Sequence, residues 1–251
     1  MRRPRTPFFI ALVLVAACGG GGDPCDAPRT PTPLDRSSAG SIAGTVTFEG
    51  SVPAMTALRL TGDPGCAAAH AGPVLAGDAL VHDGRVENAF VYLEKGLGDR
   101  VFAVPAAAVT IDQRGCVYAP HVAGVQTCQP IEFLNSDALL HNVHGSPRLS
   151  RSWNFSMGVQ GSRRTVRLAE PEVMVEVRCD VHPWMRAYLG VVDHPYWAVT
   201  GSDGRFTLAD VPPGDYVAAA WHERFGTRTQ QVTVGAKEAK QITFTFTGAG
   251  N

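Results

Sequence analysis

From Ser41 onward, apolar and polar residues alternate in short runs that stop at Gly, Pro, Asn or Asp, as in SIAGTVTFEG, PIEFLN and QITFTFTG. A period of two places successive side chains on opposite faces of a strand. Only the alanine-rich stretches at 66–71 and 104–108 suggest a helical turn, and both are short. The pattern therefore predicts an all-β chain built from two sandwich-like units.

The N-terminus has the form of an export signal. Three arginines within the first five residues precede an uninterrupted apolar run at 8–17. This run is too short for a membrane-spanning helix, which needs about 20 residues, and it fits a secretory signal. It ends in VAAC, which resembles a bacterial lipobox, whose cysteine, here Cys18, is diacylated and becomes the mature N-terminus. An ordinary signal peptide with a nearby cysteine is the alternative.

We therefore expect residues 1–18 to be a lipoprotein signal peptide with its lipobox. The mature protein would be tethered to a lipid bilayer through Cys18 without spanning it, in the bacterial cell envelope, facing the periplasm or the exterior. Residues 19–40, rich in Gly, Pro, Ser and Thr, predict a flexible tether.

The charge of the mature chain argues against a nucleic-acid partner. Removal of residues 1–17 takes three arginines from the 22 basic residues and leaves 19, against 23 acidic ones, a net charge of −4. No basic cluster remains that would suit a phosphate backbone.

One heptapeptide, CDVHPWM, brings three soft or borderline metal ligands together: Cys179, His182 and Met185. It follows the apolar run VMVEVR and precedes YLGVV, so we expect a loop between two strands, where metal ligands are often presented. A trigonal His₂Cys set with a weak axial Met is the known arrangement of this kind for copper, and it requires a second histidine. His141 in FLNSDALLHNVHG follows another predicted strand, with His144 as its competitor.

Other chemistries have less support in the sequence. Zinc prefers more thiolates or carboxylates and does not select methionine. C-x-x-C-H for haem attachment, G-x-S-x-G, H-E-x-x-H and a phosphate-binding glycine loop are all absent. A closed set of four protein ligands leaves no position for a substrate, so we expect an electron carrier rather than an enzyme, with no small-molecule substrate.

Residues from about 105 to 193 resemble a cupredoxin, most closely the amicyanin-type and plastocyanin-like blue copper proteins. The resemblance rests on VYAPHVAGV, PIEFLNSDALLHNVHG and VEVRCDVHPWMRAYLGVV. It implies a Greek-key β-sandwich holding one type 1 copper, with these ligands: His141, Cys179, His182 and Met185. It also implies that Asn142 braces the thiolate loop. One departure is Leu139–Leu140, where the family has a proline or a polar residue.

The resemblance further implies a route for electrons. In cupredoxins the edge of the histidine that corresponds to His182 reaches the surface in an apolar patch. Pro183 and Trp184 lie beside it in the sequence. We expect these two residues to form the port through which a redox protein partner exchanges electrons.

A second resemblance covers both ends of the chain. VTGSDGRFTLADVPPGDYVAAAWHERFG resembles a carboxypeptidase-regulatory or transthyretin-like β-sandwich, whose opening strands are similar to SIAGTVTFEG and ENAFVYLEK at 41–95. The combination also resembles bacterial proteins labelled methylamine-utilisation-like. We expect a discontinuous domain, 41–95 and 196–248, with a cupredoxin domain inserted at 100–194, because two strands alone are marginal in water. Three units in a row is the alternative.

Four cysteines remain once lipid and copper are assigned: Cys25, Cys66, Cys116 and Cys128. Disulfides persist in an oxidising compartment, and four cysteines allow three full pairings. Cys66–Cys116 is favoured, because Cys25 lies in the tether and Cys128 lies in a tight turn. The role of Cys128 is left open.

Three functions compete at this point. The first is a membrane-tethered blue copper protein that transfers single electrons. The second is a copper-binding module for storage, delivery or sensing. The third is an adhesion module with a vestigial site. Rapid, reversible one-electron chemistry would favour the first, and ready loss of copper to a chelator would favour the second.

Overall fold

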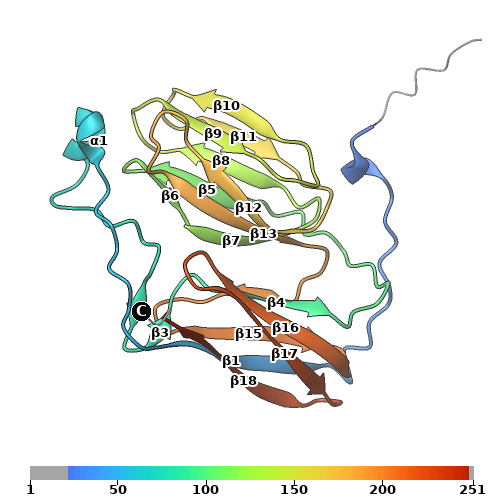
Figure 1. Ribbon diagram of the computed structural model, residues 1–251. Coiled ribbons are helices and arrows are strands. Elements are labelled where there is room, and N and C mark those ends of the chain that lie inside the picture. Colours follow the sequence, from blue (N-terminus) through green and yellow to red (C-terminus); the bar gives the residue numbers. More distant parts are fainter. Residues whose placement is uncertain (1–21, 249–251) are drawn as a thin grey trace, which may run out of the picture.

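The computed structural model describes residues 22–248, so the lipobox and Cys18 lie outside the described residues. Its strands form four sheets, which pair into two stacked sandwiches (Figure 1). The predicted all-β fold is thus confirmed. Within 22–248, no helix is long and apolar enough to cross a membrane.

The first sandwich, which we call the outer unit, combines strands from both ends of the described chain. One of its sheets contains β1 (Gly40–Glu49), β2 (Val81–His82), β3 (Arg85–Val86), β15 (Arg205–Val211) and β18 (Ala239–Thr247). The other contains β4 (Phe90–Lys95), β14 (Trp197–Val199), β16 (Gly214–His222) and β17 (Gly226–Val234). Strand β1 pairs in parallel with β18 along its length, from Ser41 opposite Ala239 to Glu49 opposite Thr247. Strands that lie before and after residues 100–194 therefore share one sheet and one core.

The second sandwich, the inner unit, is made of β5 to β13. One sheet has the order β10 (Trp153–Met157), β9 (His141–Gly145), β12 (Glu172–Arg178), β13 (Arg186–Val192) and β7 (Val122–Gln126). The other has the order β11 (Arg163–Val166), β8 (Ile131–Asn135), β5 (Val109–Arg114) and β6 (Val117–Ala119). Alternate residues of β8, IEFLN, are buried, as its sequence pattern predicts.

An apolar layer joins the two units. Phe90 and Tyr92 of β4 pack with Val122 of β7 and Val192 of β13. Gly190 and Gly124 allow this approach, because a Cβ at either position would lie within 2.5 Å of the ring of Phe90 or Trp197. Every residue of β7 is buried, since the strand packs against the inner core on one side and the outer unit on the other.

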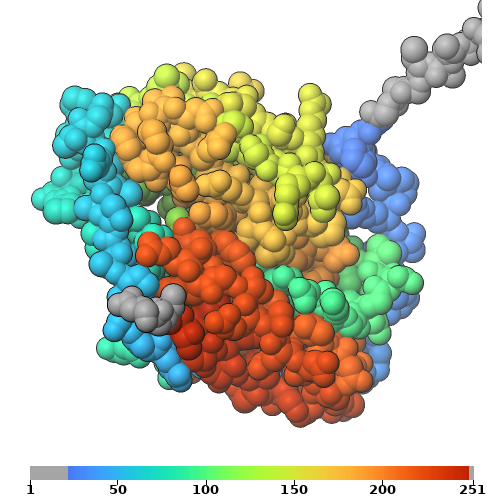
Figure 2. All heavy atoms as spheres, in the orientation of Figure 1, coloured from blue at the N-terminus to red at the C-terminus, as the bar shows by residue number. Residues whose placement is uncertain are grey.

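Residues 50–80, which we call the cap loop, leave the outer unit between β1 and β2 and reach along the side of the inner unit (Figures 1 and 2). The cap loop contains the 3₁₀ turn η2 (Leu60–Gly62) and the helix α1 (Pro64–Ala68). Leu60 and Cys66 are buried in the inner core. All of 41–95 was expected in the outer unit, and the cap loop departs from that expectation, because Leu60 and Cys66 are buried against strands of the inner unit that are distant in sequence.

The expected flexible tether also differs from the structure. The 3₁₀ turn η1 (Pro24–Asp26) is fastened by a disulfide from Cys25 to Cys128. Arg167 pairs with Asp23 at 2.8 Å and with Asp26 at 2.9 Å, and the Thr32 amide donates to the Val101 carbonyl at 2.8 Å. A segment with little to bury is thus held by a covalent bond and by polar contacts. Cys128, whose role was left open, is the anchor.

Candidate metal centre

The loop between β12 and β13 is folded back on itself. The amide of Cys179 donates to the carbonyl of Met185 at 3.2 Å, and the amide of Met185 donates to the carbonyl of His182 at 2.9 Å. The amide of His182 in turn donates to the sulfur of Cys179 at 3.3 Å. These bonds within the loop hold thiol and imidazole on the same side of it.

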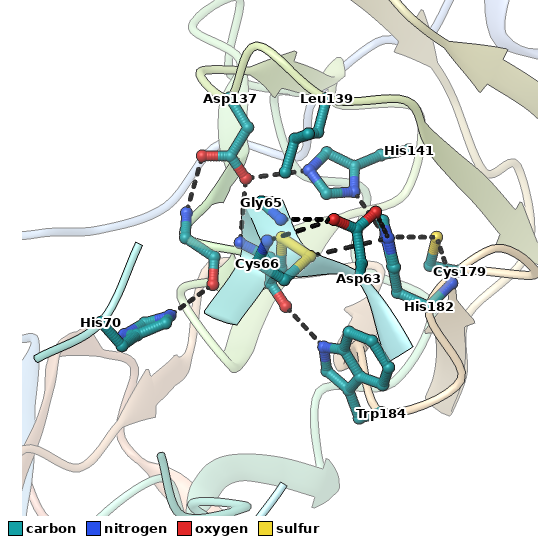
Figure 3. Close-up of a disulfide and its surroundings, with 12 residues drawn as sticks. Asp63, Gly65, Cys66, His70, Asp137, Leu139, His141, Cys179, His182 and Trp184 are labelled. Carbon is teal, nitrogen blue, oxygen red and sulfur yellow. Dashed lines mark hydrogen bonds and ion pairs between the residues drawn. A yellow bond between two sulfur atoms is a disulfide. The ribbon is translucent and has the colours of Figure 1, made fainter. Parts of the chain in front are cut away.

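Pairing between β9 and β12 brings the second histidine to this loop. Gly145 lies opposite Val177 and His144 lies opposite Arg178, so the start of β9, at His141, meets the loop that follows β12. The Nδ1 atoms of His141 and His182 are 3.0 Å apart, and Nδ1 of His182 lies 4.0 Å from the sulfur of Cys179. The structure therefore brings His141, Cys179 and His182 together, with their three donor atoms within 4.8 Å of one another (Figure 3).

All three side chains are withdrawn from water: His141 is fully buried and Cys179 and His182 are 2% exposed. Met185, at the end of the loop, is 1% exposed and belongs to the same core as Cys179. The role of Met185 as a weak axial ligand stays a prediction.

His144, the competing histidine, does not join the group. Its Nδ1 lies 3.0 Å from each carboxylate oxygen of Asp180, and its Nε2 accepts a hydrogen bond from, or donates one to, the hydroxyl of Ser146 at 3.2 Å. Its partners therefore differ from those of His141.

Each histidine of the centre has a carboxylate on its outer nitrogen. Nε2 of His141 lies 2.8 Å from Oδ2 of Asp137, and Nε2 of His182 lies 3.2 Å from Oδ2 of Asp63. These oxygens can accept a hydrogen bond from an N–H group at Nε2. This favours the tautomer in which each Nδ1 carries a lone pair that faces the sulfur of Cys179. The sequence analysis missed both aspartates, and Asp63 comes from the cap loop.

Hydrogen bonds keep the two aspartates charged. Burial raises the pKa of Asp137, but the amides of Cys116 and Gly115, at 2.9 and 2.7 Å, together with His141, outweigh burial and lower it overall. The contact with His182 and the amides of Gly65 and Cys66 lower the pKa of Asp63. Burial lowers the pKa of His141, which keeps its imidazole neutral and able to act as a ligand.

Asn142 braces the thiol from two sides. Its amide donates to the sulfur of Cys179 at 3.3 Å, and its side-chain oxygen accepts from the amide of Asp180 at 3.2 Å. Its side-chain nitrogen donates to Oδ1 of Asn154 at 2.6 Å. These hydrogen bonds join strand β9 to the loop between β12 and β13 next to the sulfur. Residues just outside the ligands of a metal site commonly orient the ligands in this way.

The donor set fits a soft cation. With the Nε2 hydrogen of each imidazole directed at an aspartate, neither Nδ1 carries a hydrogen. The two Nδ1 lone pairs then lie 3.0 Å apart and repel each other. A cation bound between them and the sulfur removes this repulsion. Two imidazoles and one thiolate, with a thioether in the same loop, suit copper. The residues present therefore fit a copper ion.

The outer edge of His182 is where the structure departs most from expectation. We expected this edge at the surface, but it is covered by Asp63 and by the Cys66–Cys116 disulfide, whose Cys66 sulfur lies 3.6 Å from Nε2 (Figure 3). The cap loop carries Asp63 and Cys66, and nothing in its sequence indicates that it lies against the inner unit. Pro183 is exposed, and Trp184 is half-buried with its ring centroid 5.1 Å from that of His182. Their role as a port stays a prediction.

Both cysteine pairs outside the centre are joined. Cys66 is linked to Cys116, the pair favoured from the sequence, and Cys25 is linked to Cys128. Among residues 22–248, Cys179 alone is a free thiol.

Comparison with protein families finds one of the two families that the sequence resembles. Residues 187–247 match the carboxypeptidase regulatory-like domain. No curated protein matches the chain.

Solved structures that are similar to parts of the chain contain copper proteins. A copper-containing nitrite reductase from Thermus scotoductus is 18% identical, with a TM-score of 0.33, over 39% of this chain and 25% of that chain. A purple cupredoxin from Nitrosopumilus maritimus is 17% identical, with a TM-score of 0.29, over 33% of this chain and 98% of that one. An oxidised amicyanin variant is 21% identical, with a TM-score of 0.31, over 42% of this chain and 99% of that one. The chain thus spans a quarter of the nitrite reductase.

Proposed function

We propose that the chain binds one copper ion through His141, Cys179 and His182, with Met185 as a weak axial ligand, and passes single electrons to and from a redox protein. The observation that carries this proposal is the convergence of two inward-facing Nδ1 atoms on one buried thiol. Bound copper would supply a one-electron Cu(I)/Cu(II) couple.

The hydrogen bonds around the three donor side chains would keep these side chains in place while the charge of the metal changes. Two backbone amides, from Asn142 and His182, donate to the sulfur at 3.3 Å. Hydrogen bonds of this kind stabilise a thiolate and tune its potential. Asp137 and Asp63 fix the ring planes from outside. Rigid ligands favour electron transfer because little reorganisation accompanies each charge change.

The protein would act as a carrier and not as an enzyme. The donors come from β9 and from one closed loop, and they fill the centre with protein groups, so no position is left for a substrate to bind the metal. We therefore assign no catalytic residue.

We also propose that Cys18 carries lipid and holds the protein on a membrane of the bacterial cell envelope. This rests on the sequence alone, because Cys18 lies outside the described residues. Mature protein should fractionate with membranes, and Cys18→Ser should yield soluble or unprocessed precursor. Intact-mass measurement of an unmodified Cys18 in the wild-type chain would contradict lipidation.

One observation favours the second candidate, copper storage or delivery. The edge of His182, the expected exit for electrons, is buried beneath the cap loop. A covered edge slows electron exchange with a large partner, while a site meant only to hold copper has no need of an exposed one.

Voltammetry of the copper-loaded protein separates the two functions, with a chelator challenge beside it. A reversible one-electron wave, together with copper that resists a chelator over hours, supports electron transfer. A sluggish, irreversible wave together with copper lost readily to the chelator supports storage or delivery. Cys179→Ser is the matched control, since it removes the sulfur donor while keeping its size.

A further inference from the structure

A second group of metal-binding side chains lies on the far side of His182, between the copper centre and the cap loop. The sulfurs of Cys66 and Cys116 and a ring nitrogen of His182 all lie within 4.8 Å of one another. These three residues are buried. In the structure the two sulfurs form a disulfide, so their ligand capacity is masked.

A fourth donor, the carboxylate of Asp63, completes this group. Its Oδ1 accepts from the amides of Gly65 and Cys66 at 2.8 and 3.3 Å, at the start of α1. Its Oδ2 faces Nε2 of His182 at 3.2 Å. One oxygen therefore orients the carboxylate, and the other faces the imidazole on the side where the cysteines lie.

The group uses the opposite edge of His182 from the copper centre. Nδ1 faces His141 and Cys179, whereas Nε2 lies 3.6 Å from the sulfur of Cys66. The two sets of donors share this one ring and otherwise have no residue in common.

Contacts other than the disulfide also hold the cap loop in place. Nε2 of His70 donates to the carbonyl of Gly115 at 2.7 Å, and Oδ2 of Asp63 lies 3.2 Å from Nε2 of His182. Leu60 is buried in the inner core. Two thiols at positions 66 and 116 would therefore remain close to each other when they are not bonded.

We propose that the dithiol form of the chain has a second metal site, made of Cys66, Cys116, Nε2 of His182 and Asp63, which takes Zn²⁺. Two thiolates, one imidazole and one carboxylate are all ligands that zinc accepts, and four of them meet its tetrahedral preference. The dithiol is the state in which every chain is synthesised, so the site needs no reductant. Exchange with an oxidised dithiol protein then closes it: that protein's disulfide is reduced to two thiols, Cys66 and Cys116 become bonded to each other, and the metal is released.

The site differs from the proposed copper centre in its ligands and in its purpose. It pins the cap loop over His182 before the disulfide forms, because metal binding to ligands on separate segments contributes directly to folding. Binding through Nε2 requires the tautomer with its hydrogen on Nδ1, so a neutral His182 holds either Zn²⁺ or copper, and a test in a chain without Cys179 keeps the two sites separate.

The experiment uses residues 19–251 carrying Cys25→Ala, Cys128→Ala and Cys179→Ser. Cys66 and Cys116 then supply the only thiols of this protein. The protein is reduced with a phosphine without oxygen and is titrated with Co²⁺, whose thiolate charge-transfer absorption reports sulfur ligands. We expect one Co²⁺ per chain with thiolate absorption, displaced by one Zn²⁺.

Three matched controls decide the result. The same chain in its disulfide form should show no thiolate absorption, and further Cys66→Ala and Cys116→Ala substitutions should abolish it. Asp63→Asn should weaken Co²⁺ binding at least ~10–100-fold, the loss typical of removing a residue that only hydrogen-bonds a metal ligand. If the reduced chain binds Co²⁺ no more tightly than the disulfide form, or if Asp63→Asn leaves affinity unchanged, the four-ligand site is wrong.

Folding is followed by circular dichroism in the same titration, because reduction removes a cross-link. A reduced chain that is unfolded without metal and folds on adding Zn²⁺ supports the site as strongly as one that stays folded and binds. A reduced chain that binds no metal overturns the proposal, whether it is folded or not.

Discussion

Replacing Cys66 and Cys116 by alanine removes the covalent bond between the cap loop and the β5–β6 turn. The two cysteines are 50 residues apart. In the chain-entropy treatment, closing a loop of that length stabilises the fold by about 4 kcal/mol at 25 °C. We expect unfolding free energy to fall by about that amount, measured by denaturant titration of the metal-free protein with tryptophan fluorescence.

The double substitution should also speed hydrogen exchange in the cap loop, next to His182. The cap loop stays docked through Leu60, Asp63 and His70, but it opens more often without its disulfide. Hydrogen exchange at the Gly65 amide, which is bonded to Asp63, and at the Trp184 indole should become faster.

A matched control comes from the other disulfide, which joins Cys25 to Cys128 across 103 residues. Its removal should destabilise the fold by a similar amount, about 4.7 kcal/mol for a loop of that length. It should leave exchange at Gly65 and Trp184 unchanged, because it lies outside the cap loop. Equal exchange rates in the two variants, or a loss below about 1 kcal/mol for Cys66→Ala with Cys116→Ala, would refute the reasoning.

Three further predictions concern the loop, the pH dependence and the domain arrangement. Asn142→Ala removes the acceptor of the Asp180 amide and should weaken copper binding ~10–100-fold and shift the potential; unchanged affinity and potential would make Asn142 an ordinary turn residue. Burial lowers the pKa of His222 from 6.5 to about 4. The unfolded chain therefore binds a proton below about pH 6.5 that the folded chain refuses until about pH 4, and stability should fall by about 3 kcal/mol across that window. His222→Asn should flatten this loss in acid titrations of the metal-free protein, and an equal slope in both proteins would contradict it. Deleting 98–195 and joining the ends with a short Gly/Ser linker should leave a soluble β-protein that melts cooperatively; an unfolded product, with 41–195 folding well alone, would favour the serial arrangement.

The sequence was informative wherever the signal is local. The proposed ligands Cys179 and His182 lie in one heptapeptide, and His141 follows a strand whose alternating pattern is visible in the sequence. Strand alternation in β8 and β15 likewise predicts which side chains are buried. These features depend on residues within a few positions of one another, and period-two patterns record them.

Asp63 could not be predicted as part of the site, for a physical reason. Asp63 is 119 residues from its partner His182, and it lies in a loop with no regular period. Nothing in residues 50–80 indicates that they leave the sandwich of their neighbours to cover another one. The same holds for the tether, where the Cys25–Cys128 bond fixes a segment whose composition is typical of a linker.

An absorption spectrum of the protein loaded with Cu(II) tests directly whether the thiolate of Cys179 binds copper together with two histidines. A His₂Cys site should bind one copper per chain and show a strong absorption band at about 600 nm from thiolate-to-copper charge transfer. Cys179→Ser should abolish the band, because an alcohol is a poor ligand for a soft metal. A wild-type protein that binds copper without the band, or a Cys179→Ser protein that keeps it, would contradict the assignment.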